Sequence, residues 1–390
     1  MTARAGAVLA IVAITLVAFS SRGSFTAVGP LLDPLERELG VSPSGGAALV
    51  ALPLVCFGLL ALVVPRLSAR VGLHRTMSLG IGILACGVLV RAAGVPGLFL
   101  GTVLVGSGIA LLNVLLPAIT KADFPHRWAL LTALVTTSMT LSASLGAGLG
   151  QPLHAVTGSA QGSLLLWLIP IALAGLFWAP VARSRNSPAG LNVPTAIAPI
   201  LRDRIGLAVA LFFGLQTLTF YTLLTWLPSI LVELGGETPQ RAGALVAIGT
   251  ALGVPVALAL PPIVGRRPSQ VPWVLGLTVL TGVAVLGLAV APAWMPELWT
   301  MLWGLANGAS FPVAMSLVQL RTRNGPQAGQ LAAAAQFAGY LLAAVGPLSV
   351  GLLIDATGSW LPCFLLLAGV VCAQLVAGIV AGRPRLIGAP

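Results

Sequence analysis

Ala61-Leu-Val-Val-Pro65, at the end of one apolar stretch, has a close counterpart in Ala257-Leu-Ala-Leu-Pro261, at the end of another. A basic residue follows each copy, Arg70 in the first and Arg266 in the second. Two further pairs repeat at the same spacing, Glu38-Leu-Gly40 with Glu233-Leu-Gly235 and Thr157-Gly-Ser159 with Thr357-Gly-Ser359, and all offsets lie between 195 and 200 residues. The repeat predicts a chain built of two similar halves.

Composition places both halves in a membrane. Of the 390 residues, 57% are hydrophobic and only 7% are charged, and the mean hydropathy is +1.02. The surface of a soluble protein needs a charged fraction of roughly a quarter. Twelve apolar runs of about twenty residues are each long enough to cross a bilayer core of ~30 Å. Because the runs are continuous rather than alternating, they favour helices over a β-barrel.

We therefore predict an all-α membrane protein with 12 transmembrane helices in two pseudo-symmetric six-helix bundles. The predicted spans are 7–31, 44–65, 76–94, 97–119, 129–152, 163–182, 206–231, 242–264, 271–291, 297–320, 329–353 and 361–381. The N-terminal bundle covers 1–182, a polar, basic cytoplasmic loop covers 183–205, and the C-terminal bundle covers 206–390.

The charges of the loops predict the orientation of the chain. Although the net charge is +11, the basic residues are spread over alternate loops, which excludes a nucleic-acid-binding patch. All Lys and Arg residues except Arg22, Arg37, Arg91 and Arg241 fall in one set of loops, and most acids fall in the other. This positive-inside pattern predicts a multi-pass protein of the cell (inner) membrane with both termini in the cytoplasm.

Arg22 is the main candidate for chemistry. It lies in the body of span one, where a charge costs at least ~2.5–3.5 kcal/mol and normally faces a water-filled cavity or a partner. No Asp or Glu lies in the middle of any span, so Arg22 suits an anchor for an anionic solute. The alternatives are hydrogen bonds to helix carbonyls and snorkelling toward the surface.

Other polar and aromatic side chains inside spans could line a site around such a solute. The amide and phenol groups could hydrogen-bond a small polar molecule, and the aromatic rings could stack on a planar one. Each could equally be a contact between helices. The candidates on spans four, seven, ten and eleven are Asn113, Gln216, Tyr221, Trp226, Asn307, Gln336 and Tyr340.

The energy source of transport stays open at this stage. Proton-driven carriers usually titrate a carboxylate within the membrane, and here the nearest acids lie at helix ends. His154, at the outer end of span five, could titrate near neutral pH or could simply be an interfacial residue. No catalytic constellation, cofactor motif or metal-ligand spacing occurs, so we expect no enzyme, no cofactor and no metal.

The two six-span halves and the basic loop between spans two and three resemble the major facilitator superfamily. In the loop, Arg70, Gly72 and Arg75 match the superfamily's gate signature, while Pro65 and Ala69 replace its first Gly and its Asp. Span four keeps Gly106-x-Gly108-x-Ala110, with Thr102 at the position of the usual Arg. The resemblance implies that Arg70, Gly72 and Arg75 belong to a cytoplasmic gate.

Within the superfamily, the chain is similar to the cyanate/nitroimidazole porter group (CynX/NimT-like). The most specific match is the run from Phe213 through Gln216, Tyr221 and Trp226 to Leu231, and Arg22 with Val28-Gly-Pro-Leu-Leu32 extends it. Departures are Ser20-Ser21 before Arg22, where relatives often carry Asn, and Asn307, where Gln is expected.

The resemblance implies a secondary active transporter that moves a small polar or anionic planar solute, cyanate-like or nitroimidazole-like, by alternating access about a midplane site. A broad-specificity drug or metabolite exporter of the same fold is the alternative. A non-transporting sensor and a membrane enzyme fit less well. The expected partners are the small-molecule substrate and the lipid bilayer, with a coupling proton or counter-ion left open, no nucleic acid, and a monomeric state.

Overall fold

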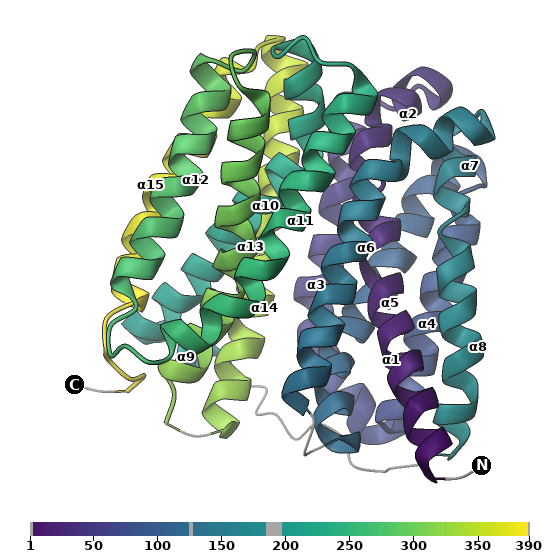
Figure 1. The fold of residues 1–390 in the computed structure, drawn as a ribbon, viewed down its shortest axis with the longest axis vertical. Coiled ribbons are helices and arrows are strands. Elements are labelled where there is room, and N and C mark those ends of the chain that lie inside the picture. The colour runs from purple at the N-terminus through teal and green to yellow at the C-terminus, as the bar shows by residue number, and fades with distance from the viewer. Residues whose placement is uncertain (1–2, 125–127, 185–196, 324, 389–390) are drawn as a thin grey trace. The chain divides into compact units, whose positions relative to one another are not determined.

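The computed structural model describes residues 3–124, 128–184, 197–323 and 325–388. About half of the predicted loop 183–205, residues 185–196, therefore lies outside the described residues. Every element in the described ranges is a helix (Figure 1). Contacts between Cα atoms divide the chain into two units, which are described separately. Unit 1 comprises Met1–Ser42 and Val55–Asn192, and unit 2 comprises Pro43–Leu54 and Val193–Pro390.

The helices of the first half follow the predicted spans. They are α1 (Ala3–Thr26), the 3-10 turn η1 (Gly29–Leu31), α2 (Leu32–Leu39), α3 (Pro43–Val71), α4 (Leu73–Val90), α5 (Gly94–Asp123), α6 (Trp128–Thr157), α7 (Ala160–Leu165) and α8 (Leu168–Ser184). In unit 1, α1 packs against α6, α8 and α5, and α4 packs against α5 and α8.

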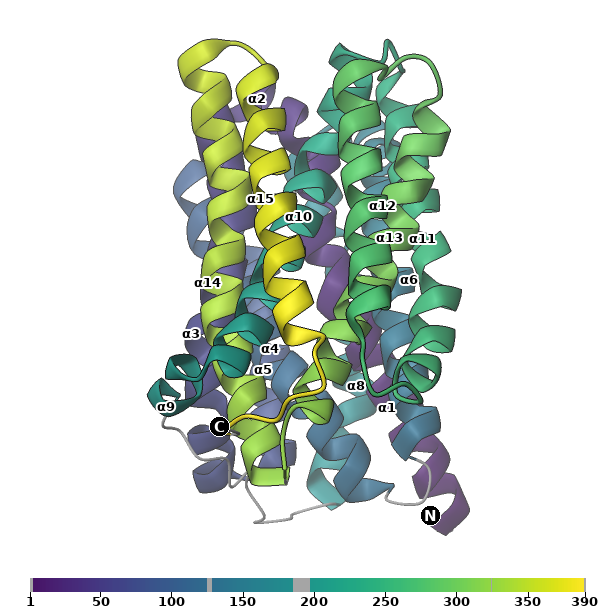
Figure 2. The same cartoon turned by 90° about the vertical axis from the view of Figure 1, so that its left-hand side faces the viewer.

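The second half repeats this order. Its helices are α9 (Ala198–Arg202), α10 (Arg204–Glu233), α11 (Pro239–Val264), α12 (Val271–Val290), α13 (Pro296–Leu320), α14 (Gly325–Thr357) and α15 (Leu361–Ala381). In unit 2, α10 packs against α14, α15, α13 and α11, while α13 packs against α11 and α12. Figure 2 shows α11, α12 and α13 side by side.

The lengths and hydropathies of these helices confirm the predicted fold class. Within the described ranges, eleven helical segments are long and apolar enough to cross a membrane. Each corresponds to one predicted span, and the 30-residue helix α6 occupies the place of the remaining span, 129–152. A helix satisfies the hydrogen-bonding needs of its own backbone N–H and C=O groups, which is why a chain segment that crosses lipid forms a helix.

Glycines set the closest helix contacts in both units. A Cβ atom on Gly101 of α5 would lie 2.5 Å from the carbonyl oxygen of Gly87 of α4. In unit 2, a Cβ atom on Gly304 of α13 would lie 1.9 Å from the carbonyl oxygen of Gly249 of α11. The backbones of these helix pairs therefore touch directly, as small residues allow in lipid.

Candidate functional site

Arg22 lies near the end of α1, and its side chain is half-buried. The backbone around it is tied to two neighbouring helices of unit 1. The N–H of Gly23 donates to Ser142 Oγ of α6 at 2.8 Å, and Ser20 Oγ donates to the Pro170 carbonyl of α8 at 3.0 Å. The Thr26 hydroxyl lies 3.0 Å from the Ala143 carbonyl. These bonds fix the depth and the rotation of α1, and hence the point from which the guanidinium leaves the helix.

Tight packing also holds α1 in a fixed position. A Cβ atom on Gly23 would lie 1.9 Å from the Trp167 ring, and one on Gly146 of α6 would lie 2.1 Å from Thr26 Oγ1. Glycine at these two positions lets the neighbouring groups approach the α1 backbone closely. The segment that carries Arg22 is therefore rigidly seated, which a charge-binding position requires.

Asn113 lies on α5, which packs against α1 in unit 1. Both polar atoms of its side chain, Nδ2 and Oδ1, are buried, and neither has a hydrogen-bond partner among the described residues. Leaving a buried amide unsatisfied costs about 1–3 kcal/mol, so such a group is unusual unless a ligand or water completes it. Asn113 thus has the character expected of a solute-binding residue.

In unit 2, three of the predicted residues lie on α10. This is the most buried of the candidate membrane helices, with 83% of its apolar window inside the molecule. Gln216 is almost fully buried, and its Nε2 donates to the Phe213 carbonyl at 3.1 Å and to Thr217 Oγ1 at 2.6 Å. Because its donor serves its own helix, Gln216 has chiefly its amide oxygen to offer a solute.

Aromatic contacts bring several predicted residues of unit 2 together. The Phe213 ring lies edge-on to Tyr340 of α14, with centroids 5.4 Å apart, and 5.7 Å from Phe311 of α13. Phe220 packs on Tyr221 at 5.0 Å and stacks on Trp303 of α13 at 5.8 Å. These two clusters bridge α10, α13 and α14 and hold both tyrosines in place.

Asn307 and Gln336 complete the predicted set in unit 2. Asn307 is buried, and its Nδ2 donates to the Trp303 carbonyl one turn earlier at 3.0 Å. Gln336, on α14 one turn before Tyr340, is half-buried. The amide oxygen of Asn307 is thus oriented by its own helix, while Gln336 is partly accessible.

Trp226 has a different setting from the other residues on α10. Its indole N–H donates to the Pro347 carbonyl of α14 at 3.2 Å, and its ring lies edge-on to Trp360 at 6.0 Å. Trp360 in turn donates to Glu233 Oε2 at 2.8 Å. The hydrogen-bond donor of Trp226 is therefore engaged in joining α10 to α14, and only its ring is left for stacking.

The predicted gate residues lie where α3 ends and α4 begins. Arg70 and Arg75 are exposed, and Gly72 has φ +93°, in the region that favours glycine. The Gly72 carbonyl accepts from the N–H of Thr76 at 3.1 Å and from its hydroxyl at 2.7 Å. Gly72 thus makes the sharp turn between the helices that the short connection requires.

Sequence reasoning missed a hydrogen-bonded pair of side chains beside this turn. His74 Nε2 lies 3.0 Å from Asp123 Oδ2 at the end of α5, and the two side chains are 3% and 10% exposed. Trp178 of α8 stacks on the imidazole, and its indole N–H donates to Ser78 Oγ at 3.2 Å. The pair joins α4 to α5 across 49 residues of chain, and no local sequence motif predicts it.

Arg91 lies within the predicted span 76–94, and sequence reasoning gave it no role. Its side chain is 1% exposed, because the guanidinium turns inward between α1 and α5. Its Nη1 donates to the Ser24 carbonyl at 2.7 Å and its Nε to Thr102 Oγ1 at 3.0 Å. The one available signal was Thr102, which stands where the superfamily usually has Arg.

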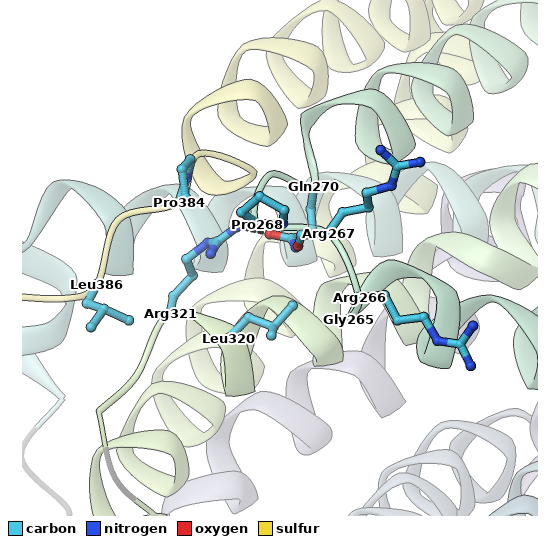
Figure 3. A pocket seen from close by; sticks show the side chains of 9 residues that line it. All are labelled: Gly265, Arg266, Arg267, Pro268, Gln270, Leu320, Arg321, Pro384 and Leu386. Carbon is cyan, nitrogen blue, oxygen red and sulfur yellow. Dashed lines mark hydrogen bonds between the residues drawn. The ribbon is translucent and has the colours of Figure 1, made fainter.

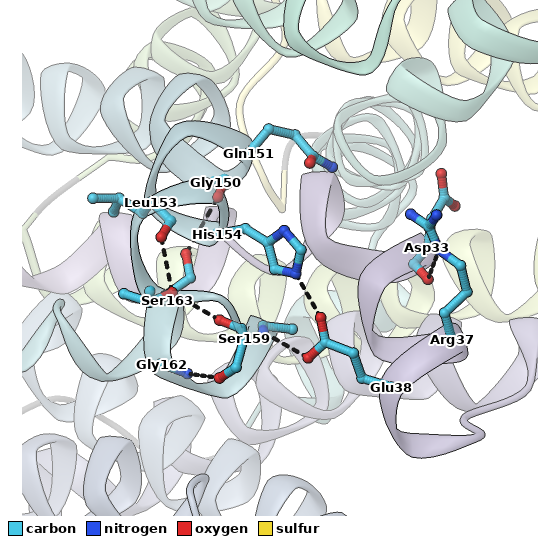
Figure 4. Close-up of polar contacts among 12 residues, drawn as sticks. Asp33, Arg37, Glu38, Gly150, Gln151, Leu153, His154, Ser159, Gly162 and Ser163 are labelled. Atoms are coloured by element: carbon cyan, nitrogen blue, oxygen red, sulfur yellow. Dashed lines mark hydrogen bonds and ion pairs between the residues drawn. The ribbon is translucent and has the colours of Figure 1, made fainter.

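His154, at the outer end of α6, lies in a polar cluster of unit 1 (Figure 4). Its Nε2 is hydrogen-bonded to Glu38 Oε1 of α2, and Glu38 Oε2 accepts from the N–H of Ala160 at 2.8 Å. Both carboxylate oxygens thus tie α2 to α6 and α7. His154 therefore takes part in a hydrogen bond that joins α6 to α2.

Comparison with known proteins agrees with this architecture. Residues 14–347 match the Major Facilitator Superfamily. The chain is 36% identical over 380 residues to the uncharacterized transporter YycB of Bacillus subtilis (strain 168), covering 97% of this chain and 94% of that one. It is 32% identical over 383 residues to the 2-nitroimidazole transporter of Escherichia coli (strain K12), covering 97% of each. It is also 28% identical over 350 residues to that organism's cyanate transport protein CynX, covering 89% and 90%.

Solved structures show the same fold. A D-xylose–proton symporter aligns with a TM-score of 0.70 at 16% identity, covering 96% of both chains. A bacterial homologue of the lysosomal transporter Spinster aligns with a TM-score of 0.68 at 14% identity, covering 95% of this chain and 94% of that one. The resemblance to the cyanate and nitroimidazole porters is confirmed, and these relatives are transporters rather than enzymes. The chain is a multi-pass membrane protein and belongs to the Major Facilitator Superfamily.

Proposed function

We propose that this protein is a secondary active transporter of a small, planar, polar or anionic solute and works by alternating access. The observation that carries the proposal is Arg22, a half-buried arginine in the body of the apolar span Gly6–Leu39. A charge at such depth is retained for function more often than for packing. Relatives named for cyanate and 2-nitroimidazole transport support the size and shape of the solute.

Electrostatics favours an anion over a cation. Arg22 is permanently charged. Its planar guanidinium can donate hydrogen bonds to a carboxylate-like or linear anion with better geometry than the compact ammonium of a lysine could. The sequence places no carboxylate in the middle of a span that could attract a cation. An anionic or strongly dipolar solute would therefore be stabilised beside Arg22, and a lipophilic cation would be repelled.

The remaining contacts are assigned by chemistry. Asn113 in unit 1 supplies a buried amide whose polar atoms are unsatisfied within the described ranges. In unit 2, Gln216 and Asn307 supply amide oxygens, and Gln336 supplies a whole amide group. The aromatic rings for a planar solute come from Tyr221, Tyr340 and Trp226. Arg70, Gly72 and Arg75 would act in the cytoplasmic gate and make no contact with the solute.

Orientation and domain limits belong to the same proposal. The positive-inside distribution supports both termini in the cytoplasm and a place in the inner membrane. The internal repeat supports bundles 1–182 and 206–390 with the cytoplasmic connection 183–205 between them. The protein is proposed to act as a monomer.

Ligand-dependent thermal stability tests the proposal. Purified protein would be heated with cyanate, other small anions, 2-nitroimidazole or lipophilic cations, because a ligand at ~100 Kd adds ~2.7 kcal/mol of stability. Arg22→Ala removes the proposed anchor. Arg37→Ala is the matched control, since it removes an exposed arginine of the same unit whose Nε donates to the Asp33 carbonyl in its own helix.

We expect an anion or a nitroimidazole to stabilise the wild type and Arg37→Ala but not Arg22→Ala. If lipophilic cations stabilise the wild type and Arg22→Ala equally, and no anion does, the proposed solute class is wrong. The broad-specificity exporter then takes its place.

A further inference from the structure

A basic pocket of about 500 Å³ lies at one end of unit 2 (Figure 3). It is formed where the α11–α12 connection, the end of α13 and the C-terminal tail meet. Its walls are Gly265, Arg266, Arg267, Pro268, Gln270, Leu320, Arg321, Pro384 and Leu386. Three of these nine residues are arginines, and none is acidic. The volume falls within the ~300–1,000 Å³ typical of small-molecule sites.

Arg321 forms a fixed floor for this pocket. Its side chain is 3% exposed, with Nε 2.8 Å from the Ala381 carbonyl and Nη2 3.0 Å from the Gly382 carbonyl. Nη2 also donates to Gln270 Oε1, and Figure 3 shows the guanidinium directed toward Gln270. The carbonyls at the end of α15 thus hold a charged arginine in place without a carboxylate.

Arg266 and Arg267 lie on the other side of the pocket and are exposed. Neither side chain has a hydrogen bond or an ion pair to another residue that the structure describes. Two such arginines next to a buried one create a positive potential that an external anion can neutralise. Arginine also has the fork geometry that phosphate oxygens accept.

The C-terminal tail holds the opposite wall in place. The Ile387 N–H donates to the Arg321 carbonyl at 2.9 Å, and the Gly388 N–H donates to Asp203 Oδ2 at 3.0 Å. Asp203 Oδ1 caps α10 by accepting from the Ile205 and Gly206 N–H groups. The nearby acid is therefore engaged with backbone groups, and the tail keeps Pro384 and Leu386 at the rim.

An apolar helix face begins next to the pocket. Helix α12 starts at Val271, one residue after Gln270, and its outward face carries exposed side chains along its whole length. They are Leu275 (42% exposed), Val279 (50%), Val283 (44%), Leu286 (63%) and Val290 (75%). Trp273, half-buried in the first turn of α12, suits the membrane–water boundary. This pattern is the one expected where the basic pocket faces lipid headgroups and α12 faces acyl chains.

We propose that this pocket binds the phosphate headgroup of an anionic phospholipid of the inner leaflet. Basic pockets on the cytoplasmic side of membrane helices bind such headgroups. Arg266 and Arg267 contact the phosphate oxygens, Arg321 supplies the fixed charge beneath, and the acyl chains lie along α12. Free inorganic phosphate shares the charge but gains nothing from the apolar face, so the lipid is the favoured source. The site is independent of the transported solute.

Lipid titration tests this site in the full-length protein. Protein in neutral detergent would be titrated with phosphatidylglycerol, phosphatidylcholine or inorganic phosphate, and bound lipid would be counted by native mass spectrometry. Each arginine near an anionic headgroup contributes about fivefold in affinity. The double variant Arg266→Gln/Arg267→Gln is expected to bind phosphatidylglycerol about 30-fold more weakly than the wild type. The matched control Arg66→Gln/Arg183→Gln removes two exposed arginines from unit 1.

The proposal predicts tight binding of phosphatidylglycerol to the wild type and the control, and weak binding of phosphatidylcholine to all three proteins. Equal loss in both double variants would show a diffuse charge effect and would overturn the site. Binding of inorganic phosphate in preference to phosphatidylglycerol would overturn the lipid source. Because no solute is present, these outcomes do not depend on the proposed transport function.

Discussion

Replacing Gly304 by alanine tests whether α11 and α13 are held in direct backbone contact. The new Cβ atom would lie 1.9 Å from the Gly249 carbonyl oxygen, 2.3 Å from its carbonyl carbon and 2.8 Å from its Cα. Ordinary contact begins at 3.4 Å, so the atom is about 1.5 Å too close to the oxygen. All three neighbours are backbone atoms, so no side chain can turn away and the two helices must separate.

The expected cost follows from two opposing effects. Overpacking in a tight core costs about 1–3 kcal/mol, while alanine gains about 0.5–1 kcal/mol over glycine in a helix. Gly276→Ala on α12 is the matched control, because nothing lies within 4 Å of its Cβ position. The helix-propensity gain is common to both variants, so their difference isolates the overpacking, about 1–3 kcal/mol. Gly253→Ala, whose nearest atom would be Gly308 Cα at 2.8 Å, should fall between them.

The assay is unfolding by sodium dodecyl sulfate in mixed micelles, which gives a free energy of unfolding for each variant. We expect Gly276→Ala to equal or exceed the wild type, Gly253→Ala to lie below it, and Gly304→Ala to be the least stable. If Gly304→Ala were as stable as Gly276→Ala, the close backbone contact between α11 and α13 would be refuted.

Two further predictions concern single positions. Gly72→Ala should cost about 1–3 kcal/mol of unfolding free energy, because φ at Gly72 is +93°. Gly82→Ala in the interior of α4, with open space around its Cβ position, should be neutral or stabilising by the same measurement, and equal stability of the two would contradict the argument. Asp203→Ala should cost about 1 kcal/mol at neutral pH through loss of the α10 cap. Burial alone would raise the pKa of Asp203, but hydrogen bonds from the Gly388, Gly206 and Ile205 N–H groups together lower it below its ordinary 3.8. The stabilisation is therefore complete above that value and disappears as pH falls through the lower folded pKa, so melting curves of wild type and variant should converge in acid and not at neutral pH.

Hydropathy and the internal repeat were sufficient to predict the membrane helices. Each predicted span coincides with a helical segment of the structure, and a boundary shifts by as much as eight residues at 7–31, where the apolar segment runs over Gly6–Leu39. The reason is that lipid offers no hydrogen bonds, so an apolar run of this length has few alternatives to a helix. Proline and turn residues shape this segment only locally, through the 3-10 turn Gly29–Leu31 that joins α1 to α2.

The candidate site was predictable only as a set of residue types. The polar residues within spans identified Arg22, Asn113 and Gln216 as candidates. They did not predict which of these side chains would already be hydrogen-bonded within the protein. The amide of Asn113 is unsatisfied, whereas the Nε2 of Gln216 is bonded within its own helix. Trp226, chosen as a stacking residue, also donates to the Pro347 carbonyl 121 residues away. Such partners depend on which helices become neighbours, and local sequence does not encode this.

The sequence by itself determined the helical membrane class, the twofold repeat and the position of a charge inside span one, because each depends on residues close together along the chain. The tertiary structure alone decided which polar groups meet. Arg91, to which the sequence gave no partner, is buried against Ser24, and His74 pairs with Asp123. The basic pocket at Arg321 likewise needs three segments that are far apart in the chain. In each case the favourable term is a hydrogen bond or charge interaction between distant segments, and it exists only after the helices have packed.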